Sequence, residues 1–168
     1  TKSPAQFNPE KLAWLNNHYI KLADNARLAE LAMPELERDG AQLAGGPELS
    51  DVIAVLKDRA NTVNELADAA MLFYRQPQPD PALLTQHLTD SARTALKQFV
   101  AAARTIEWTK EAITGLIKQV LADHQMKMPQ LAMPLRLLVT GQLQTPAVDV
   151  VLALFGRNVV LERIAQHL

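Results

Sequence analysis

The sequence predicts an all-α protein made of two packed helical subdomains. Apolar residues recur at spacings of three and four along most of the 168-residue chain, and helix-capping residues appear at short intervals. Only one short apolar run, 135–139, also fits a strand, because a run of that length does not distinguish a strand from buried helix. Three prolines within 76–81 interrupt the helical pattern. We therefore predict one subdomain over 1–75 and a second over 76–168.

Helix-start chemistry marks the elements of the first subdomain. Asn8 and Pro9 suit an N-cap and a first helical position, and the helix that follows carries Tyr19 and Leu22 on its apolar face. A second helix is predicted over 26–39, although Pro34 should kink or split it. The later elements are a loop from Gly40 to Pro47, a helix that restarts at Pro47, and a helix opened by the capping box of Thr62 and Glu65.

The second subdomain shows the same signals. Asp80 with Pro81 opens a short helix, and Thr89 or Asp90 starts a longer one. The remaining predicted elements are a helix capped by Thr109 and ending within 123–125, a helix that Thr145 and Pro146 begin and Gly156 ends, and a last helix through Val159 and Ile164.

Composition excludes several classes of protein. The absence of cysteine excludes disulfides, thiolate metal sites and cysteine nucleophiles, and a reducing cytosol is the simplest location. A net charge of −1 does not indicate the positive field of a generic nucleic-acid binder. No apolar run approaches the ~20 residues that span a membrane. The chain starts at Thr1, close to a helix-start signal, so we expect it to be a piece of a longer protein.

Common catalytic motifs are missing. The chain contains no glycine-rich phosphate loop, no Gly-x-Ser-x-Gly turn and no His-Glu-x-x-His helix. Its four histidines are scattered without the spacing of metal ligands. Carboxylates that share helix faces are typical of solvated surfaces. We assign no catalytic residue and no metal site.

Four blocks of the chain resemble the C-terminal region of bacterial glutamyl-tRNA synthetases. The most specific is the run Met-Pro-Leu-Arg-Leu-Leu-Val-Thr-Gly over 133–141, followed by Thr145, Pro146 and Leu-Ala-Leu-Phe-Gly over 152–156. The other blocks, in the same order as in that family, are the Phe-Asn-Pro-Glu-Lys-Leu segment from 7, the segment 56–73, and Trp-Thr-Lys-Glu-Ala-Ile over 108–113.

The resemblance implies an α-helical domain that reads the anticodon loop of glutamate tRNA. A separate catalytic domain, whose His-Ile-Gly-His-type and Lys-Met-Ser-Lys-Ser-type signatures do not occur in these 168 residues, would attach glutamate using ATP with Mg²⁺. The fragment alone would then have no ligase activity and need no cofactor. Its partner would be tRNA, with neither DNA nor a membrane involved, and the protein would act as a cytoplasmic monomer.

The resemblance also implies four contact residues: Arg59, Arg136, Thr145 and Val148. Arg59 corresponds to an arginine that reads the third anticodon base, since a guanidinium donates to the O2 and N3 acceptors of cytosine. Arg136 would contact the first anticodon nucleotide. Thr145 would cap a helix whose N-terminus contacts RNA. Val148 stands where the family often has leucine, and would pack against a base.

Structural alternatives remain open for these residues. Arg59 fits a solvated helix surface, and Arg136 fits an intramolecular salt bridge. Met133 stands where many relatives have glutamine, which removes a polar group near the site. Trp14 and Trp108 suggest base stacking, but their place at helix starts favours packing. The alternative for the whole chain is a non-catalytic helical protein-interaction module, and a self-contained enzyme is a third, unsupported possibility.

Overall fold

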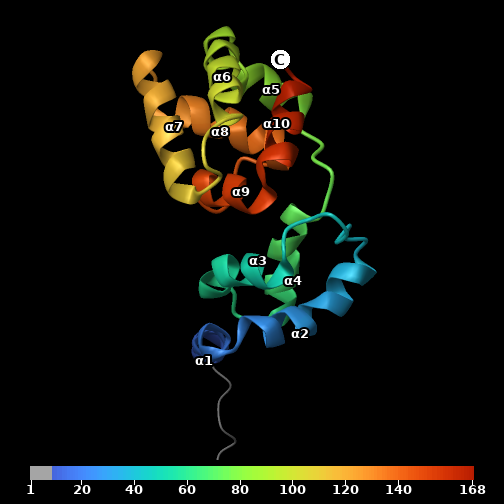
Figure 1. Cartoon of the computed structure of the whole chain (residues 1–168). Helices are drawn as coiled ribbons and strands as arrows, with labels where there is room; N and C mark the ends of the chain where they lie inside the picture. Colours follow the sequence, from blue (N-terminus) through green and yellow to red (C-terminus); the bar gives the residue numbers. More distant parts are fainter. Residues whose placement is uncertain (1–8) are drawn as a thin grey trace, which may run out of the picture. The chain divides into compact units, whose positions relative to one another are not determined.

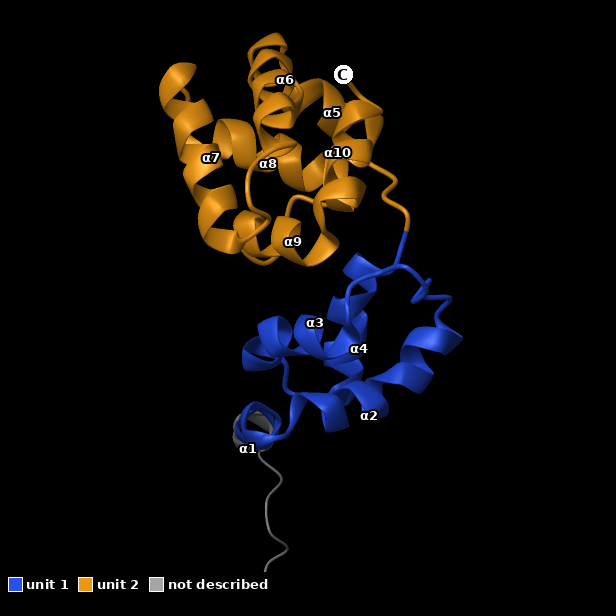
Figure 2. Cartoon of the chain, in the orientation of Figure 1, with its two compact units in different colours: residues 1–75 blue, residues 76–168 orange. Residues whose placement is uncertain are grey.

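The computed structural model describes the backbone of residues 9–168 and the side chains of residues 16–168. Helices are the regular elements of this part of the chain, and it contains no strand, as the sequence predicted. The chain divides into two compact units, which cover residues 1–75 and 76–168 (Figure 2). Both are built from short helices joined by loops (Figure 1).

Unit 1 is built around three helices that pack against one another. These are α2 (Asn25–Arg38), α3 (Leu49–Leu56) and α4 (Val63–Ala70), and one-turn 3₁₀ helices follow α3 (Lys57–Arg59) and α4 (Met71–Phe73). Leu36, Ile53 and Leu66, one from each α-helix, are fully buried and form the centre of the core. The Thr62 hydroxyl accepts from the Glu65 amide at 3.0 Å, so the predicted cap of α4 is confirmed.

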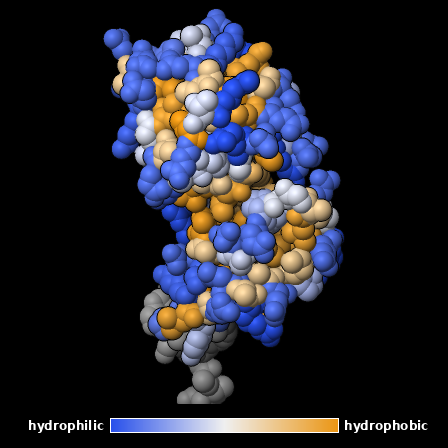
Figure 3. Space-filling model, in the orientation of Figure 1, coloured by the Kyte–Doolittle hydropathy of each residue, from blue (hydrophilic) through white to orange (hydrophobic). Residues whose placement is uncertain are grey.

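Two expectations for the start of unit 1 need correction. Of the two effects expected of Pro34, a kink or a split, the split does not occur, because α2 continues through it to Arg38. In α1 (Pro9–Leu22), Tyr19 and Leu22 remain 67% and 73% exposed, and Ile20 is buried instead. Figure 3 shows hydrophobic side chains in orange on this face, interspersed with hydrophilic ones in blue. The predicted Asn8 cap and the Trp14 side chain lie outside the described residues.

Unit 2 arranges five helices around a central one. The outer helices are α5 (Pro81–His87), α6 (Asp90–Ala103), α7 (Lys110–Asp123), α9 (Val148–Phe155) and α10 (Arg157–Ala165). All five pack against α8 (Met128–Thr140), which includes the run 135–139 and settles it as helix (Figure 1). Because α8 is covered on most sides, it lacks the polar face by which an amphipathic helix is identified in a sequence.

Local capping chemistry fixes three helix starts in unit 2. Asp80 accepts from the Ala82 amide at 2.9 Å, and Thr89 and Thr109 accept from the amides three residues on, each at 3.1 Å. These side chains satisfy amides that have no partner inside the helix. The starts of α5, α6 and α7 are therefore the predicted ones.

The turn after α8 rests on the chain segment that enters unit 2. Gly141 ends α8 with φ +77°, and a Cβ on it would lie 3.0 Å from the backbone nitrogen of Gln78. Only glycine meets both conditions without strain. The end of α8 is also held by α10, because Arg163 donates to the carbonyl of Val139 at 2.7 Å. Burial lowers the pKa of the Arg163 guanidinium.

Candidate nucleic-acid interface

Arg136 lies on α8 and is half-buried. Its Nε donates to the hydroxyl oxygen of Thr145 at 3.0 Å, which joins α8 to the loop before α9. Arg136 forms no ion pair with any side chain of residues 16–168, so the intramolecular salt bridge left open by the sequence is not present there. The two terminal nitrogens of its guanidinium have no hydrogen-bond partner among the same residues, and they remain available as donors.

A cavity of about 260 Å³ lies beside this arginine, between α7, α8 and the start of α9. Val148 is buried and contributes to its wall, and Asp149 follows it on the same side. The full lining is Thr114, Ile117, Met128, Pro129, Ala132, Met133, Arg136, Ala147, Val148 and Asp149. Apolar groups make up most of this wall, with one cation and one anion among them, so the cavity suits a flat ring that carries polar edges.

Thr145 does not have its predicted role as a helix cap. α9 begins at Val148, with Ala147 as its N-cap residue and no side-chain capping bond. The backbone of Ala147 (φ −50°, ψ 135°) is not helical, so the helix begins only after it. The Thr145 hydroxyl instead donates to the carbonyl of Pro146 at 2.7 Å and accepts from Arg136. Thr145 therefore orients the arginine rather than the helix.

Sequence patterns did not indicate several of the residues that line this cavity. Met128 and Ala132 precede Arg136 by eight and four positions, so helical spacing places all three on one face of α8. This spacing would have predicted the shared face if residues 128–140 had been taken as a helix. Thr114 and Asp149 come together only in the fold, where the threonine hydroxyl donates to the carboxylate at 2.7 Å.

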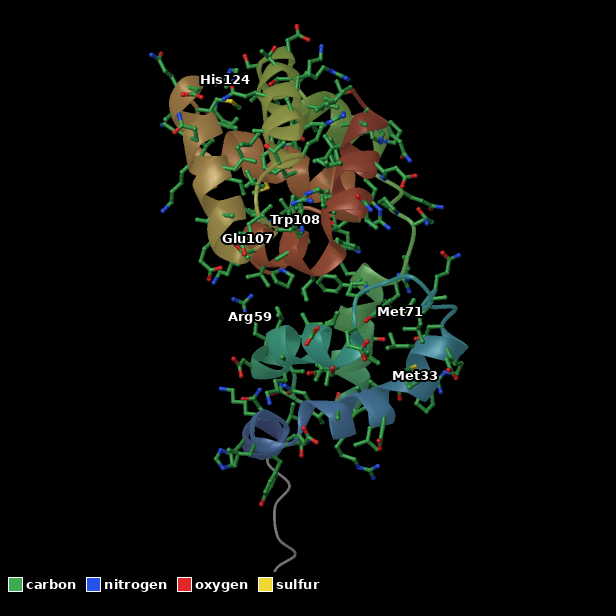
Figure 4. All side chains as sticks on the ribbon, in the orientation of Figure 1. Met33, Arg59, Met71, Glu107, Trp108 and His124 are labelled. Carbon is green, nitrogen blue, oxygen red and sulfur yellow. The ribbon has the colours of Figure 1, made fainter. Side chains whose placement is uncertain are left out.

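Arg59 belongs to unit 1, in the 3₁₀ helix after α3. Its side chain is exposed, extends outward from the ribbon (Figure 4) and has no partner among residues 16–168. The backbone on both sides of it is held from α1, because Asn17 donates to the carbonyls of Asp58 and Ala60 at 3.1 and 2.8 Å. Arg59 is thus a free cation on a restrained turn.

Trp108 has a structural role in unit 2. Its indole Nε1 donates to the carbonyl of Leu152 at 3.1 Å, which connects the start of α7 to α9 (Figure 4). The guanidinium of Arg157 lies 5.6 Å from the centre of its ring. A ring that is half-buried and already stacked by a cation offers little surface to a base, which supports the packing interpretation.

The described residues give no support to two other kinds of site. Across residues 16–168 there is no group of three His, Cys, Asp or Glu side chains that could hold a metal ion. The described helices are also too short or too polar to cross a bilayer.

Comparisons with known proteins agree with the geometry. A family model described as an anticodon binding domain matches residues 27–168. Glutamate–tRNA ligase of Janthinobacterium sp. (strain Marseille) is 64% identical over 100% of this chain and 36% of its own length. The enzyme of the same name from Herminiimonas arsenicoxydans is 62% identical with the same coverage. This chain therefore spans about a third of the length of these curated relatives.

The fold is also found in a solved structure. A glutamate tRNA ligase from Elizabethkingia meningosepticum CCUG26117, crystallised in complex with its amino acid, superimposes with a TM-score of 0.83 over 98% of this chain and 33% of that chain, at 21% identity. At this identity the likeness concerns the fold alone. The comparisons favour an anticodon-binding domain over a protein-interaction module, and the chain belongs to the anticodon binding domain family.

Proposed function

We propose that this chain reads the anticodon loop of glutamate tRNA on behalf of a glutamate–tRNA ligase. The observation that carries the proposal is the convergence of three of the expected contact residues at one place in unit 2. Arg136 and Val148 line the same cavity, and Thr145 is hydrogen-bonded to Arg136. The names of the relatives supply the class of RNA.

The cavity beside Arg136 would receive the first anticodon base. Its apolar wall, which includes Val148 and Ile117, would cover the faces of the ring, and the free terminal nitrogens of Arg136 would donate to acceptors on its edge. Thr145 holds Nε and so fixes the plane of the guanidinium before RNA arrives. An arginine held in this way loses less conformational entropy on binding.

Arg59 would read the third anticodon base from unit 1. Cytosine presents O2 and N3 as acceptors to a guanidinium, whereas the Watson–Crick edge of guanine presents N1 and N2 donors beside its O6 acceptor. The exposed, unpartnered side chain of Arg59 is available for such a contact, and its restrained turn limits where it can reach. Glutamate and glutamine tRNAs, which differ there as C and G, would be distinguished by this residue.

The chemistry of aminoacylation would belong to the remainder of the longer protein. We propose that the whole protein is a cytoplasmic monomer that attaches glutamate to its tRNA using ATP and Mg²⁺. The relatives support this through their name and through the two thirds of their length that this chain does not match. No residue of this chain is assigned to that step.

The test is a titration of this chain, at low salt, with the anticodon stem-loop of glutamate tRNA and with a loop whose third anticodon base is changed from C to G. Low salt is chosen because phosphate contacts weaken steeply as salt rises. We expect tighter binding of the C-containing loop. Arg59→Ala should abolish this preference, at a cost of about 1–3 kcal/mol by analogy with bidentate base contacts in DNA.

Exposed arginines outside the proposed contacts provide controls. Arg75→Ala in unit 1 and Arg104→Ala in unit 2 should lower affinity slightly for both loops and leave the preference for C intact. Arg136→Ala should weaken binding of both loops more than either control. Equal binding of the two loops by the unaltered chain would refute the Arg59 assignment, and no binding of either loop would refute the proposal itself.

A further inference from the structure

A second cavity opens on unit 2, next to the first along the surface of α8. Its volume is about 520 Å³, within the range of roughly 300–1,000 Å³ that is usual for ligand sites. The cavity is formed by the end of α5, the start of α6 and the first half of α8. It is lined by Gln86, His87, Thr89, Ser91, Met126, Pro129, Gln130, Met133 and Pro134.

The two cavities share one wall. Pro129 and Met133 line both of them. These residues stand four apart on α8, so they lie one above the other on the helix surface and form an apolar ridge. A chain of nucleotides that places one base beside Arg136 has only this ridge to cross before its next base reaches the second cavity.

The polar groups of the second cavity are largely unused. Thr89 and Gln130 already accept hydrogen bonds from the amides of Ala92 and Lys127. The side chains of Gln86, His87 and Ser91, in contrast, have no hydrogen bond or ion pair with any residue in 16–168. Together they offer both donors and acceptors, as the edge of a nucleobase requires.

The charge of the lining favours a base over a phosphate. No Lys, Arg, Asp or Glu side chain is part of it. A phosphate site needs cationic or clustered amide donors, and none of the basic residues of unit 2 reaches this cavity. Met126, Met133 and the two prolines instead provide apolar surface for the face of a ring.

We propose that the second cavity binds an unpaired RNA base adjacent to the anticodon nucleotide held beside Arg136. The strand crosses the ridge of Pro129 and Met133, and Gln86, His87 and Ser91 hydrogen-bond the edge of the adjacent base. This inference rests on the proposed function, because it assumes that the first cavity holds an anticodon base. It adds a recognition site to unit 2 for a loop nucleotide outside the contacts described above.

The experiment combines protein variants with modified RNA. Gln86→Ala and Ser91→Ala alter exposed positions, so folding should be preserved, and Thr94→Ala, also exposed on α6 but outside the cavity, is the matched control. Each is titrated with the glutamate-tRNA anticodon stem-loop and with loops in which one loop nucleotide at a time is abasic. The imidazole C–H signals of His87 are followed by NMR during the titration of the unaltered chain.

We expect Gln86→Ala and Ser91→Ala to weaken binding of the intact loop about three- to tenfold each, the loss that one hydrogen bond implies. Thr94→Ala should bind as the unaltered chain does. The losses should disappear with the one RNA whose abasic nucleotide adjoins the base beside Arg136, because coupled partners give non-additive effects. The His87 signals should shift with the intact loop and not with that abasic loop.

The outcomes separate this inference from the proposed function. If Arg136→Ala weakens binding while Gln86→Ala and Ser91→Ala do not, and the His87 signals stay unchanged, the second site is refuted and the proposed function stands. The second site is also refuted if the losses persist with every abasic loop. If the unaltered chain binds no loop at all, both proposals fail together.

Discussion

The side chain of Asn17 donates a 2.8 Å hydrogen bond to the carbonyl of Ala60, 43 residues further along the chain. A second bond, to the carbonyl of Asp58, lies on the other side of Arg59. The turn that presents Arg59 is therefore anchored by Asn17 of α1. Asn17 itself is not one of the proposed RNA contacts. The restraint gives Asn17 a positioning role that can be measured.

We expect Asn17→Ala to lower the free energy of unfolding of unit 1 by about 1–2 kcal/mol, because two hydrogen bonds are lost. Under the proposed function it should also reduce the preference for the C-containing loop while leaving Arg59 in place. Thermal unfolding and the two-loop titration measure the two effects. Asn158→Ala, an exposed position on α10, is the control. An Asn17→Ala variant with full base preference would show that the anchor does not matter for recognition.

Thr145→Val tests the orientation of Arg136. The change keeps the shape of the side chain but removes the oxygen that accepts from Nε at 3.0 Å. We expect RNA affinity to fall about three- to tenfold, with little change in the melting temperature, since the arginine loses one neutral-partner hydrogen bond and its fixed plane. Thr145→Ser retains the hydroxyl and should restore affinity. Equal affinities for the Val and Ser variants would contradict this role.

Gly141→Ala should destabilise unit 2. The alanine would adopt φ +77°, and its Cβ would lie 3.0 Å from a backbone nitrogen that cannot move aside easily. We expect a loss of about 2–4 kcal/mol in denaturant unfolding, from left-handed strain together with the close contact. Gly115→Ala is the matched control: Gly115 lies within α7 with nothing within 4 Å of its Cβ position, so that variant should gain about 0.5–1 kcal/mol. Similar behaviour of the two variants would refute the argument.

The buried phenol of Tyr74 should make the protein less stable at alkaline pH. Its phenol donates to the carbonyl of Pro47 at 2.8 Å, and burial, with Glu48 and Asp51 nearby, raises the pKa of Tyr74 to about 12. Below the unfolded pKa of about 10 the phenol is protonated in both states, and above it the unfolded state releases its proton first. Stability should therefore fall between about pH 10 and pH 12.

The measurement is chemical unfolding across that pH range for the unaltered chain and for Tyr74→Phe. The phenylalanine variant starts less stable at pH 8, because it lacks the hydrogen bond to Pro47. Its stability should then decline less steeply with pH, and the two curves should converge by about pH 12. Parallel curves would mean that the phenol titrates at its ordinary pKa in the folded protein.

Local signals explain why most helix starts could be predicted. Asp80, Thr89 and Thr109 cap their helices through amides two or three residues away, so the necessary chemistry is contained in a few adjacent positions. Thr145, followed by Pro146, also has the pattern of a helix cap, but that prediction was wrong. Its hydroxyl is bonded to Arg136, nine residues earlier, and the helix begins only at Val148. A cap and a tertiary contact look alike in a sequence.

The candidate site was predictable only in part. Family resemblance named Arg136 and Val148, which line the cavity. Thr114 and Ile117 reach the cavity from α7, and no sequence pattern places that helix beside the start of α9. α8 itself had no recognisable polar face because five helices cover it. The expected contact residues could thus be named from the chain, whereas the walls of the cavity depend on packing.

Under the proposed function, the central position of α8 also limits where base recognition can change. Arg136 sits between Leu135 and Leu137, both fully buried, so substitutions along this helix alter the core of unit 2 together with the cavity. Ala147, which also lines the cavity, is exposed and lies outside that core. Under the proposed function, base preference could therefore vary at Ala147, in the loop before α9, at little expense in stability, while α8 stays fixed by the core.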